Sequence, residues 1–318
     1  MSGQNALKES YIEELRTNGY IDLATASDDI DPVFEEFRSF LELCDEPGGQ
    51  KFADAITYTP DDVHNGGDYF VNRRRVGDIN PYAINKAPST EDKDVAHIGP
   101  VSLLRAEAVL GKRGVPAIMR QFLTSCVELH HINRAEVGPV FEVFGIKDIM
   151  LAEDPEDDIF VDRFLRYLSS NISHKAGLHL DRSAFTAARK ETTPGLVGTP
   201  ANNAQRIPMS ISELDAIEAR ANATPVHHTP GHIKLFAGAG YNRFSDDVYN
   251  INGELPLFMH GVLNLVPDEE RFARVGFMHP HLKAARAMNY LIPRASETGI
   301  EGIRAYLEEL YGAEESVA

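Results

Sequence analysis

The sequence contains no tryptophan and only two cysteines among its 318 residues. Cys44 and Cys126 are too few for a disulfide framework, and each lies among apolar residues of a segment with helical periodicity. We therefore expect both thiols to be buried and reduced. Basic residues are also scarce, because 31 Lys and Arg against 48 Asp and Glu give a formal net charge of −17. Nucleic acid is not an expected partner, since phosphate binding requires a dominant basic surface.

Long apolar runs are missing as well. No run approaches the roughly 18 residues of a membrane-spanning helix, and the mean hydropathy is −0.27. The first residues, MSGQNALKES, lack the basic and then apolar layout of a signal peptide. These absences predict a soluble, cytoplasmic protein with no membrane partner. Without repeats or linkers, residues 1–318 read as a single domain, and the oligomeric state is left open.

The first half of the chain carries helical signals. Ser10-Tyr11-Ile12-Glu13 has the pattern of a capping box, and the helix that it begins is expected to stop at Gly19, before a short strand at 20–23. Asp31-Pro32 opens a second helix that runs to Pro47. Pro116 opens a longer one, expected to end or kink at Gly138-Pro139.

From about residue 159 the pattern changes to short β-like runs with Gly, Pro and Asn between them. A capping box at Thr298 then starts a C-terminal helix. Helices followed by many short strands predict a jelly-roll or barrel core flanked by N-terminal and C-terminal helices, of which a distorted double-stranded β-helix (jelly roll) is the expected form. The expected division is a helix-rich half over 1–158, the core over 159–281 and helices over 282–318. The expected strands are 160–168, 177–186, 232–236, 257–266 and 271–278.

His179-Leu180-Asp181 and the distant His260 are the candidate metal ligands. If His179 and Asp181 lie on one strand, they point the same way, because alternate residues of a strand share a face. Two imidazoles and one carboxylate, with three positions left open, form the ligand set of a mononuclear non-haem Fe(II) site. The alternative is a purely structural role, in which both histidines are buried core residues and the aspartate is a turn residue.

Residues 160–281 resemble the Fe(II)/2-oxoglutarate dioxygenases of the isopenicillin N synthase-like group. The resemblance rests on the order of a strand, His-x-Asp, a second His in an apolar strand, and Glu269-Glu270-Arg271 ending eleven residues after His260. It implies that His179, Asp181 and His260 bind iron and that the N-terminal half forms part of the substrate pocket. The resemblance over that half is weaker.

The same resemblance assigns Arg271 to the far carboxylate of 2-oxoglutarate, and a planar guanidinium suits bidentate pairing with a carboxylate. Arg274 is the competing candidate, but in a regular strand it faces away from Arg271. Tyr167 and Asn171 are at places from which family members often reach the co-substrate. The sequence departs from the common Arg-x-Ser, because Ala273 stands where the serine would be and one hydroxyl is missing.

The implied cofactors are Fe(II), 2-oxoglutarate and O2, with ascorbate as a stimulant, and the implied products include succinate and CO2. The substrate is expected to be a small molecule oxidised at a C–H bond, by hydroxylation in the first place and otherwise by desaturation or cyclisation. Asp181 disfavours halogenation, since related halogenases have a small residue there. Two alternatives remain: an iron oxidase or cyclase that does not use 2-oxoglutarate, and a non-catalytic jelly-roll binding protein.

Further clusters are weaker candidates for function. His227, His228 and His232 resemble a helical metal spacing, but Thr229-Pro230-Gly231 breaks a helix and favours a loop that enters a strand. His279-Pro280-His281 fits a strand end, near the mouth of the site. Arg73, Arg74 and Arg75 are candidates for binding a substrate carboxylate or phosphate, against a solvated loop. Residues 182–230 are a candidate lid.

Overall fold

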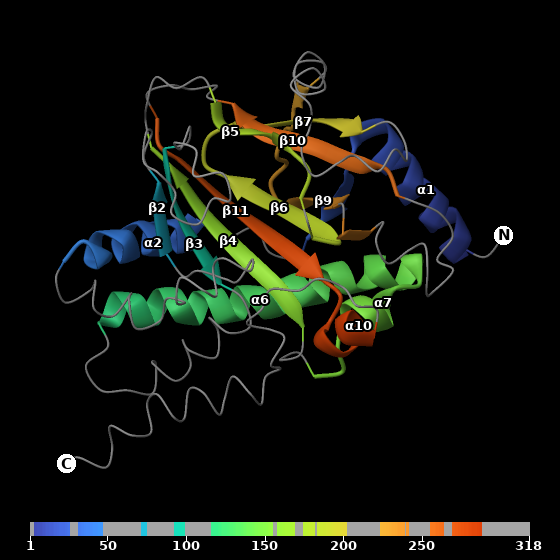
Figure 1. Cartoon of the computed structure of the whole chain (residues 1–318), viewed down its shortest axis with the longest axis horizontal. Helices are drawn as coiled ribbons and strands as arrows, with labels where there is room; N and C mark the ends of the chain where they lie inside the picture. Colours follow the sequence, from blue (N-terminus) through green and yellow to red (C-terminus); the bar gives the residue numbers. More distant parts are fainter. Residues whose placement is uncertain are drawn as a thin grey trace, which may run out of the picture.

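The computed structural model describes residues 3–25, 31–46, 71–74, 92–98, 116–154, 158–168, 174–181, 183–201, 223–238, 240–241, 255–263 and 269–287. Within them, long helices lie along one side of a large, strongly curved sheet (Figure 1). The helices are α1 (Gly3–Asn18), α2 (Asp31–Cys44), α6 (Ala117–Phe144), α7 (Lys147–Met150) and α10 (Leu282–Ala287). The strands are β1 (Ile21–Ala24), β2 (Val71–Arg74), β3 (Lys93–Ile98), β4 (Ile159–Tyr167), β5 (His174–His179), β6 (Phe185–Glu191), β7 (Leu196–Ala201), β8 (Thr224–Pro225), β9 (His232–Ala237), β10 (Leu257–Leu263) and β11 (Arg271–His279).

Eleven strands form one sheet in the order β2-β3-β4-β11-β6-β9-β10-β7-β8, with β1 paired to β9 and β5 paired to β10. Most neighbours are antiparallel. The sheet curls, because Val262 of β10 packs in one buried cluster with Val95 of β3, Leu165 of β4 and Ala273 of β11. The fold is thus mainly β with helices on its outside, as the change of pattern near residue 159 predicted.

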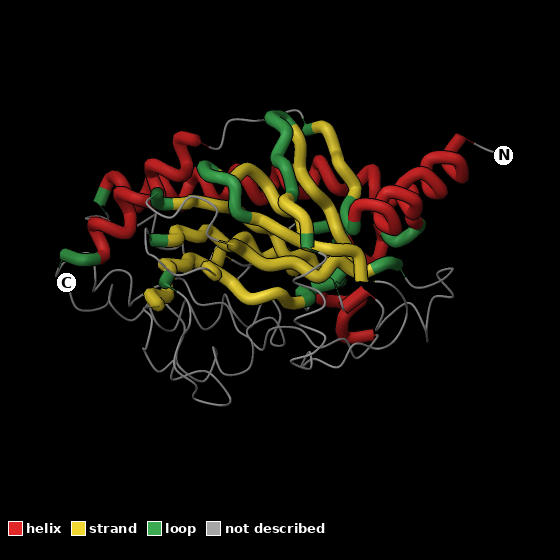
Figure 2. The backbone as a smooth tube through the Cα atoms, turned by 90° about the horizontal axis from the view of Figure 1, so that it is seen from above, coloured by secondary structure: helices red, strands yellow, loops and turns green. Residues whose placement is uncertain are grey.

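Alternation along the strands separates an outer and an inner face. On the outer face, Phe164 and Phe272 join the buried aromatic residues of α2 and α6, including Phe37 and Phe122. Farther along, Phe185 packs against the C-terminal half of α6 in a second cluster. The view from above shows these helices along one side of the strands (Figure 2). The inner face is left to line a pocket.

Two helix boundaries differ from expectation. α1 begins at Gly3, well before the capping-box pattern at Ser10, although it does end at Gly19, whose φ of +85° an L side chain rarely adopts. α6 continues through Pro139 to Phe144 and ends at Gly145 in the left-handed conformation. Proline removes one hydrogen bond there, but the following turn buries Val140, Phe141 and Phe144 and so continues the helix.

One expectation about the strands is also corrected. Residues 177–186 are not one strand, because β5 ends at His179 and β6 begins at Phe185. The candidate lid over 182–230 contains strands β6, β7 and β8, and its residues 202–222 lie outside the described residues. The remaining expected strands occur within a few residues of their predicted bounds. The helix predicted after Thr298 lies outside the described residues. None of the helices in the described ranges has the length and apolar character needed to span a lipid bilayer.

Candidate metal centre

The three candidate ligands meet at one point. His179 and His260 are direct cross-strand partners in the β5–β10 pair, and their ring centroids are 4.6 Å apart. Asp181 lies two residues beyond the end of β5. Contrary to the expectation from the sequence, it therefore does not lie on the same strand as His179. Its Oδ1 is 3.4 Å from Nε2 of His179, and its Oδ2 is 3.4 Å from Nε2 of His260. One ligand atom from each residue lies within 4.8 Å of the other two, close enough to share one ion.

Asp181 is buried and held by hydroxyl groups. Thr186 of β6 donates a hydrogen bond of 2.7 Å to Asp181 Oδ2. Ser183 Oγ lies 2.9 Å from the Thr186 hydroxyl and donates to it, since the Thr186 proton is already given to the carboxylate. Burial raises the pKa of Asp181, but the imidazoles of His260 and His179 and the Thr186 hydroxyl outweigh burial and hold the pKa below its usual range. The carboxylate is therefore ionised, as a metal ligand must be.

His260 is presented with its Nε2 toward the other two ligands. Its Nδ1 lies 3.2 Å from the carbonyl oxygen of Phe258 and donates to it, which leaves Nε2 as the acceptor nitrogen. Burial lowers the pKa of His260 to about 4, and neighbouring Asp181 only partly opposes this. The imidazole is neutral near pH 7, the form that binds a metal. His179, by contrast, is half exposed, with 46% of its side chain accessible.

The triad opens into a pocket of about 420 Å³ enclosed by the inner face of the sheet. One wall is apolar and is formed by Leu165, Val262 and Ala273. Charged and polar groups stand at the other walls. The further lining residues are Lys93, Arg163, Tyr167, Ala188, Arg189, Leu196, His228, Arg271, Arg274, Val275 and Phe277.

The two candidate arginines of β11 lie in different environments. Arg271 lies with its Cζ 4.9 Å from the centre of the Tyr167 ring, in the cross-strand register Arg271↔Tyr167. Arg274 also lines the pocket, but it is fully buried and its guanidinium points to the outer face, where its Nη2 donates to Asp162 at 2.8 Å and to the Leu129 carbonyl of α6. The geometry thus separates the two as alternation along a strand predicts.

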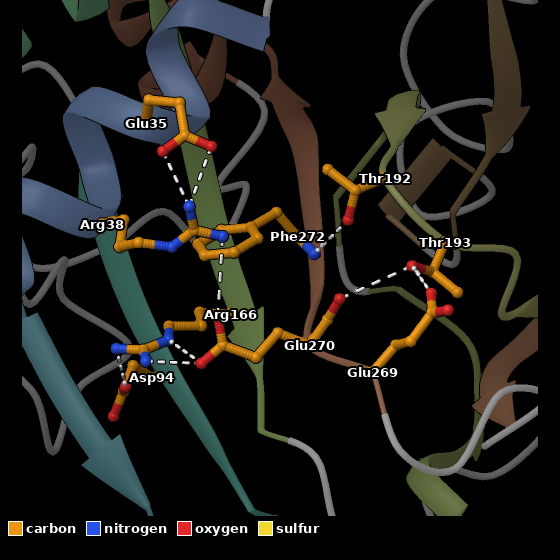
Figure 3. A network of polar contacts seen from close by, with 9 residues as sticks. All are labelled: Glu35, Arg38, Asp94, Arg166, Thr192, Thr193, Glu269, Glu270 and Phe272. Atoms are coloured by element: carbon orange, nitrogen blue, oxygen red, sulfur yellow. Dashed lines mark hydrogen bonds and ion pairs between the residues drawn. The ribbon is translucent and has the colours of Figure 1, made fainter.

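Glu270, immediately before Arg271, belongs to a network on the outer face (Figure 3). Its carboxylate accepts a hydrogen bond of 3.0 Å from Arg166 of β4 and lies 3.6 Å from Arg38 of α2. The backbone N–H of Phe272 donates to the Thr192 hydroxyl at 2.9 Å. These contacts fix the start of β11 and therefore the position from which Arg271 enters the pocket.

The other residues singled out in the sequence are dispersed. Arg73 and Arg74 belong to β2, which pairs with β3, while Arg75 and Asn171 lie outside the described residues. His227 and His228 lie in the loop before β9; His228 lines the pocket, whereas His232 binds Asp22 at 2.9 Å. His279 ends β11, and burial lowers its pKa to about 4 against the opposing charge of Asp181.

Three residues at or behind the pocket wall were not predicted from the sequence: Lys93, Arg163 and Glu191. Lys93 aligns with Tyr167 of β4, and Arg163 aligns with Val275 of β11. Because both partners line the pocket, Lys93 and Arg163 lie on the inner face as well. The alternation of β4 could have indicated Arg163, since Leu165 and Tyr167 follow it at even spacing. Glu191 contacts Arg271, and a register shift in β6 that leaves no mark in the sequence pattern brings it there.

No protein-family model and no curated protein matches the sequence. Solved structures match most of the chain. Dioxygenase for auxin oxidation 1 of Arabidopsis thaliana, in a complex with 2-oxoglutarate, has a TM-score of 0.56 at 13% identity over 95% of this chain and 96% of its own. A 2OG-Fe(II) oxygenase family protein of Caulobacter crescentus gives 0.57 at 16% identity over 97% and 95%. A full-length Neurospora crassa protein in complex with alpha-KG and thymine gives 0.53 at 16% over 87% and 81%.

The chain has the fold of the iron- and 2-oxoglutarate-dependent oxygenases. The resemblance drawn from residues 160–281 is confirmed, and the match also covers the N-terminal half, where that resemblance was weaker. Among the described residues, the His179, Asp181 and His260 cluster is a group that could hold a metal ion.

Proposed function

We propose that the protein is an Fe(II)- and 2-oxoglutarate-dependent oxygenase with a distorted double-stranded β-helix core. It oxidises a C–H bond of a small molecule, most simply by hydroxylation, and releases succinate and CO2. One observation carries the proposal: His179, Asp181 and His260 converge in the same pocket as Arg271. A metal site and a fixed cation at one cavity fit a ligand that bridges them.

The donor set fits Fe(II). His179, Asp181 and His260 would hold the ion through two imidazole nitrogens and one carboxylate oxygen, a donor set typical of non-haem Fe(II) sites that leaves positions for other ligands. Bound Fe(II) and 2-oxoglutarate together supply the activation of O2 in such a site. The chain contributes an ionised Asp181, a neutral His260 and hydroxyl groups that hold the carboxylate in place.

The co-substrate would lie along the apolar wall. A 2-oxoglutarate molecule has two methylene groups between its acidic ends, and Leu165, Val262 and Ala273 offer them an apolar surface. Arg271 is placed to bind the far carboxylate, beside the ring of Tyr167. The side chain of Ala273 donates no hydrogen bond, so this carboxylate depends on Arg271 more than it would beside a serine.

The pocket favours a small acidic substrate. A volume of about 420 Å³ suits a small molecule in addition to the co-substrate. Arg163 lies over the Phe277 ring, with its Cζ 4.4 Å from the ring centre, and lines the cavity that holds the triad. Its guanidinium suits a carboxylate of the substrate. Arg73, Arg74 and Arg75 remain proposed as further substrate contacts.

The iron and co-substrate assignment is tested by spectroscopy. Anaerobic addition of Fe(II) and 2-oxoglutarate is expected to give a visible charge-transfer band that His179→Ala abolishes. His232→Ala is the matched control, because it removes a histidine that contacts Asp22 on β1 and not the triad. A wild-type protein that shows no band would contradict the proposal.

A second candidate is an iron oxidase or cyclase of the same fold that does not consume 2-oxoglutarate, and the missing hydroxyl at Ala273 favours it. Succinate measured during turnover separates the two, since this candidate forms none. Metal content after purification distinguishes these two iron enzymes from a non-catalytic binding protein. In the binding protein, His179→Ala and His260→Ala would leave the metal content unchanged.

The substrate can be sought by mass shift. Candidate organic acids and neutral heterocycles such as thymine, which is bound in the Neurospora crassa structure, are incubated with enzyme, Fe(II), 2-oxoglutarate and ascorbate. Gain of one oxygen indicates hydroxylation, and loss of two hydrogens indicates desaturation or ring formation. Arg163→Gln is expected to raise KM for an acidic substrate; turnover of neutral compounds alone would contradict the proposed substrate class.

A further inference from the structure

We infer that Glu191 is a positioning residue, which holds the guanidinium of Arg271 from one side so that its remaining donors face the far carboxylate of 2-oxoglutarate. The inference rests on the proposed function, because it assigns a role within the co-substrate site. It concerns a residue of β6 that the sequence pattern did not single out.

A bulge in β6 brings Glu191 to Arg271. Ala188 aligns with Val275 of β11, whereas Glu191 aligns with Ala273, so three steps along β6 match two steps along β11. The extra residue reverses the alternation of side chains beyond it. Ala188 and Glu191 therefore both lie on the side of Ala273 and Arg271. Arg189 also lines the pocket, but its guanidinium turns outward and its Nε donates to Asn133 of α6.

The Glu191 carboxylate is held firmly behind the arginine. It accepts hydrogen bonds from the backbone N–H groups of Gly195 at 3.2 Å and Leu196 at 3.3 Å. Its Oε2 also accepts from Arg271 Nε at 2.8 Å and from Arg271 Nη2. Only 4% of its side chain is accessible. Arg271 lines the pocket, whereas Glu191 is not among the lining residues. Glu191 therefore supports the arginine from behind and does not compete with a ligand in the pocket.

The opposite side of the guanidinium remains available. Nε also donates to the Thr193 carbonyl at 3.1 Å, so Glu191 and the turn after β6 use the Nε side. Nη1 is buried and has no hydrogen-bond partner among the described residues. An arginine has five N–H donors, and both protons of Nη1 and the second of Nη2 are left for a bidentate carboxylate. A buried donor without a partner costs free energy that such a ligand would recover.

Two further contacts restrict the guanidinium to this orientation. The Tyr167 ring lies on it, with the ring centre 4.9 Å from Cζ. Gly195 approaches it so closely that a Cβ at that position would lie 2.7 Å from Nε. Residues 191–195 thus surround the Nε side of the Arg271 guanidinium with the Glu191 carboxylate, the Thr193 carbonyl and Gly195. Without Glu191, the charged group would lose its orientation before the co-substrate binds.

The experiment titrates 2-oxoglutarate into the anaerobic Fe(II) protein and follows the charge-transfer band. Glu191→Gln is expected to raise the dissociation constant for 2-oxoglutarate about tenfold and to leave the affinity for Fe(II) alone unchanged. 2-Oxobutyrate, which has the same keto acid end but no far carboxylate, should bind wild type and variant equally. Glu269→Gln is the matched control, because this exposed acid contacts Thr193 and not the guanidinium.

Gly195→Ala is a second variant, which displaces Arg271 by steric contact, and it is expected to weaken 2-oxoglutarate in the same selective way. Unchanged 2-oxoglutarate binding in both variants, or equal losses for 2-oxoglutarate and 2-oxobutyrate, would overturn the role of Glu191 while leaving the oxygenase assignment intact. Absence of the band in the wild type would instead contradict the proposed function, and the inference with it.

Discussion

Thr186 shows how one hydroxyl prepares the metal site. It is fully buried on β6 and donates to the oxygen of Asp181 that faces His260. Asp181 lies in the loop after β5, where no regular strand geometry holds it. The hydrogen bond from Thr186 of β6 therefore replaces the support that a position within β5 would have given.

Thr186→Val is expected to lower metal affinity about tenfold or more, since hydrogen bonds to metal ligands commonly contribute that much. The isosteric change removes the hydroxyl and leaves Asp181 free to rotate. Titration with Co(II), followed by its visible absorption, measures the effect, and Thr186→Ser is expected to restore most of the affinity. Equal affinities in Thr186→Val and the wild type would show that the loop alone orients Asp181.

The burial of His130 in α6 leads us to expect that the free energy of unfolding decreases at acidic pH, independently of any metal. Its ring packs edge-on against Phe160 with centroids 5.6 Å apart, and burial lowers its pKa from 6.5 to about 4. As pH falls from 6.5 to 4, His130 becomes protonated in the unfolded chain but stays neutral in the folded chain. The free energy of unfolding therefore decreases over that pH range. The loss reaches about 3 kcal/mol at most.

His130→Phe removes this titration and keeps the aromatic packing. Denaturant unfolding at pH 7 and at pH 4.5 is therefore expected to show a smaller loss of stability in the variant than in the wild type. The wild-type curve should fall more steeply below pH 6.5. Parallel curves for the two proteins would mean that the ring is protonated in the folded state over this range.

The sequence pointed to the candidate ligands, which the structure brings together, but not to the residues that support them. His179 and His260 lie in apolar segments, Asp181 follows His179 by two residues, and Arg271 follows His260 at the distance that the family resemblance implies. Glu191 carries no such signal, because its position depends on one extra residue in β6 relative to β11. A bulge shifts every later side chain to the other face, and alternation read along one strand does not reveal it.

Strands β7 and β10 meet at a site that only glycine permits. Gly198 of β7 and Gly19 after α1 both face the ring of Phe258, and a Cβ at either position would lie 2.1 Å from a ring carbon. The same Phe258 accepts the Nδ1 proton of His260 through its carbonyl and lies nearly parallel to the imidazole. Packing between these elements and the orientation of a metal ligand are thus coupled through one residue.

Gly198→Ala is expected to destabilise the protein by about 1–3 kcal/mol, as overpacking of a core commonly does, and to weaken metal binding as well. The added methyl displaces Phe258 and with it the carbonyl that fixes His260. Chemical denaturation and a metal titration measure the two effects. Gly3→Ala is the control, since a Cβ there meets nothing within 4 Å. A loss of stability without weaker metal binding would refute the coupling.

Helix α6 illustrates where local rules were overridden by tertiary contacts. Proline predicts an end or a kink near Pro139, yet the helix continues to Phe144 because Val140, Phe141 and Phe144 bury their side chains against the sheet. The stop at Gly145 agrees with the preference of glycine for the left-handed conformation. The apolar spacing predicted helices α1, α2 and α6 and strands β1, β4, β9, β10 and β11. It did not predict strands β2, β3, β7 and β8, and the pairing of β5 with β10 required the folded chain.

The metal is expected to stabilise the whole fold, because its three ligands join segments that are far apart in the sequence. β5, the loop carrying Asp181, and β10 come together at the triad, and metal binds them only when all are folded. A ligand at a concentration of about 100 times its dissociation constant adds about 2.7 kcal/mol to the free energy of unfolding. For a chain of this length, that corresponds to a rise in Tm of several degrees.

Thermal unfolding with Mn(II), compared with unfolding in EDTA, measures this linkage without any reaction. The rise in Tm is expected to be retained in His232→Ala and lost in Asp181→Ala, which removes the shared carboxylate. Adding 2-oxoglutarate should raise Tm further only when the metal is present, because the proposed binding mode places the keto acid end on the ion and the far carboxylate on Arg271. An equal rise from 2-oxoglutarate in EDTA would mean that Arg271 binds the acid independently of the metal, and the proposed bridge between triad and clamp would then be wrong.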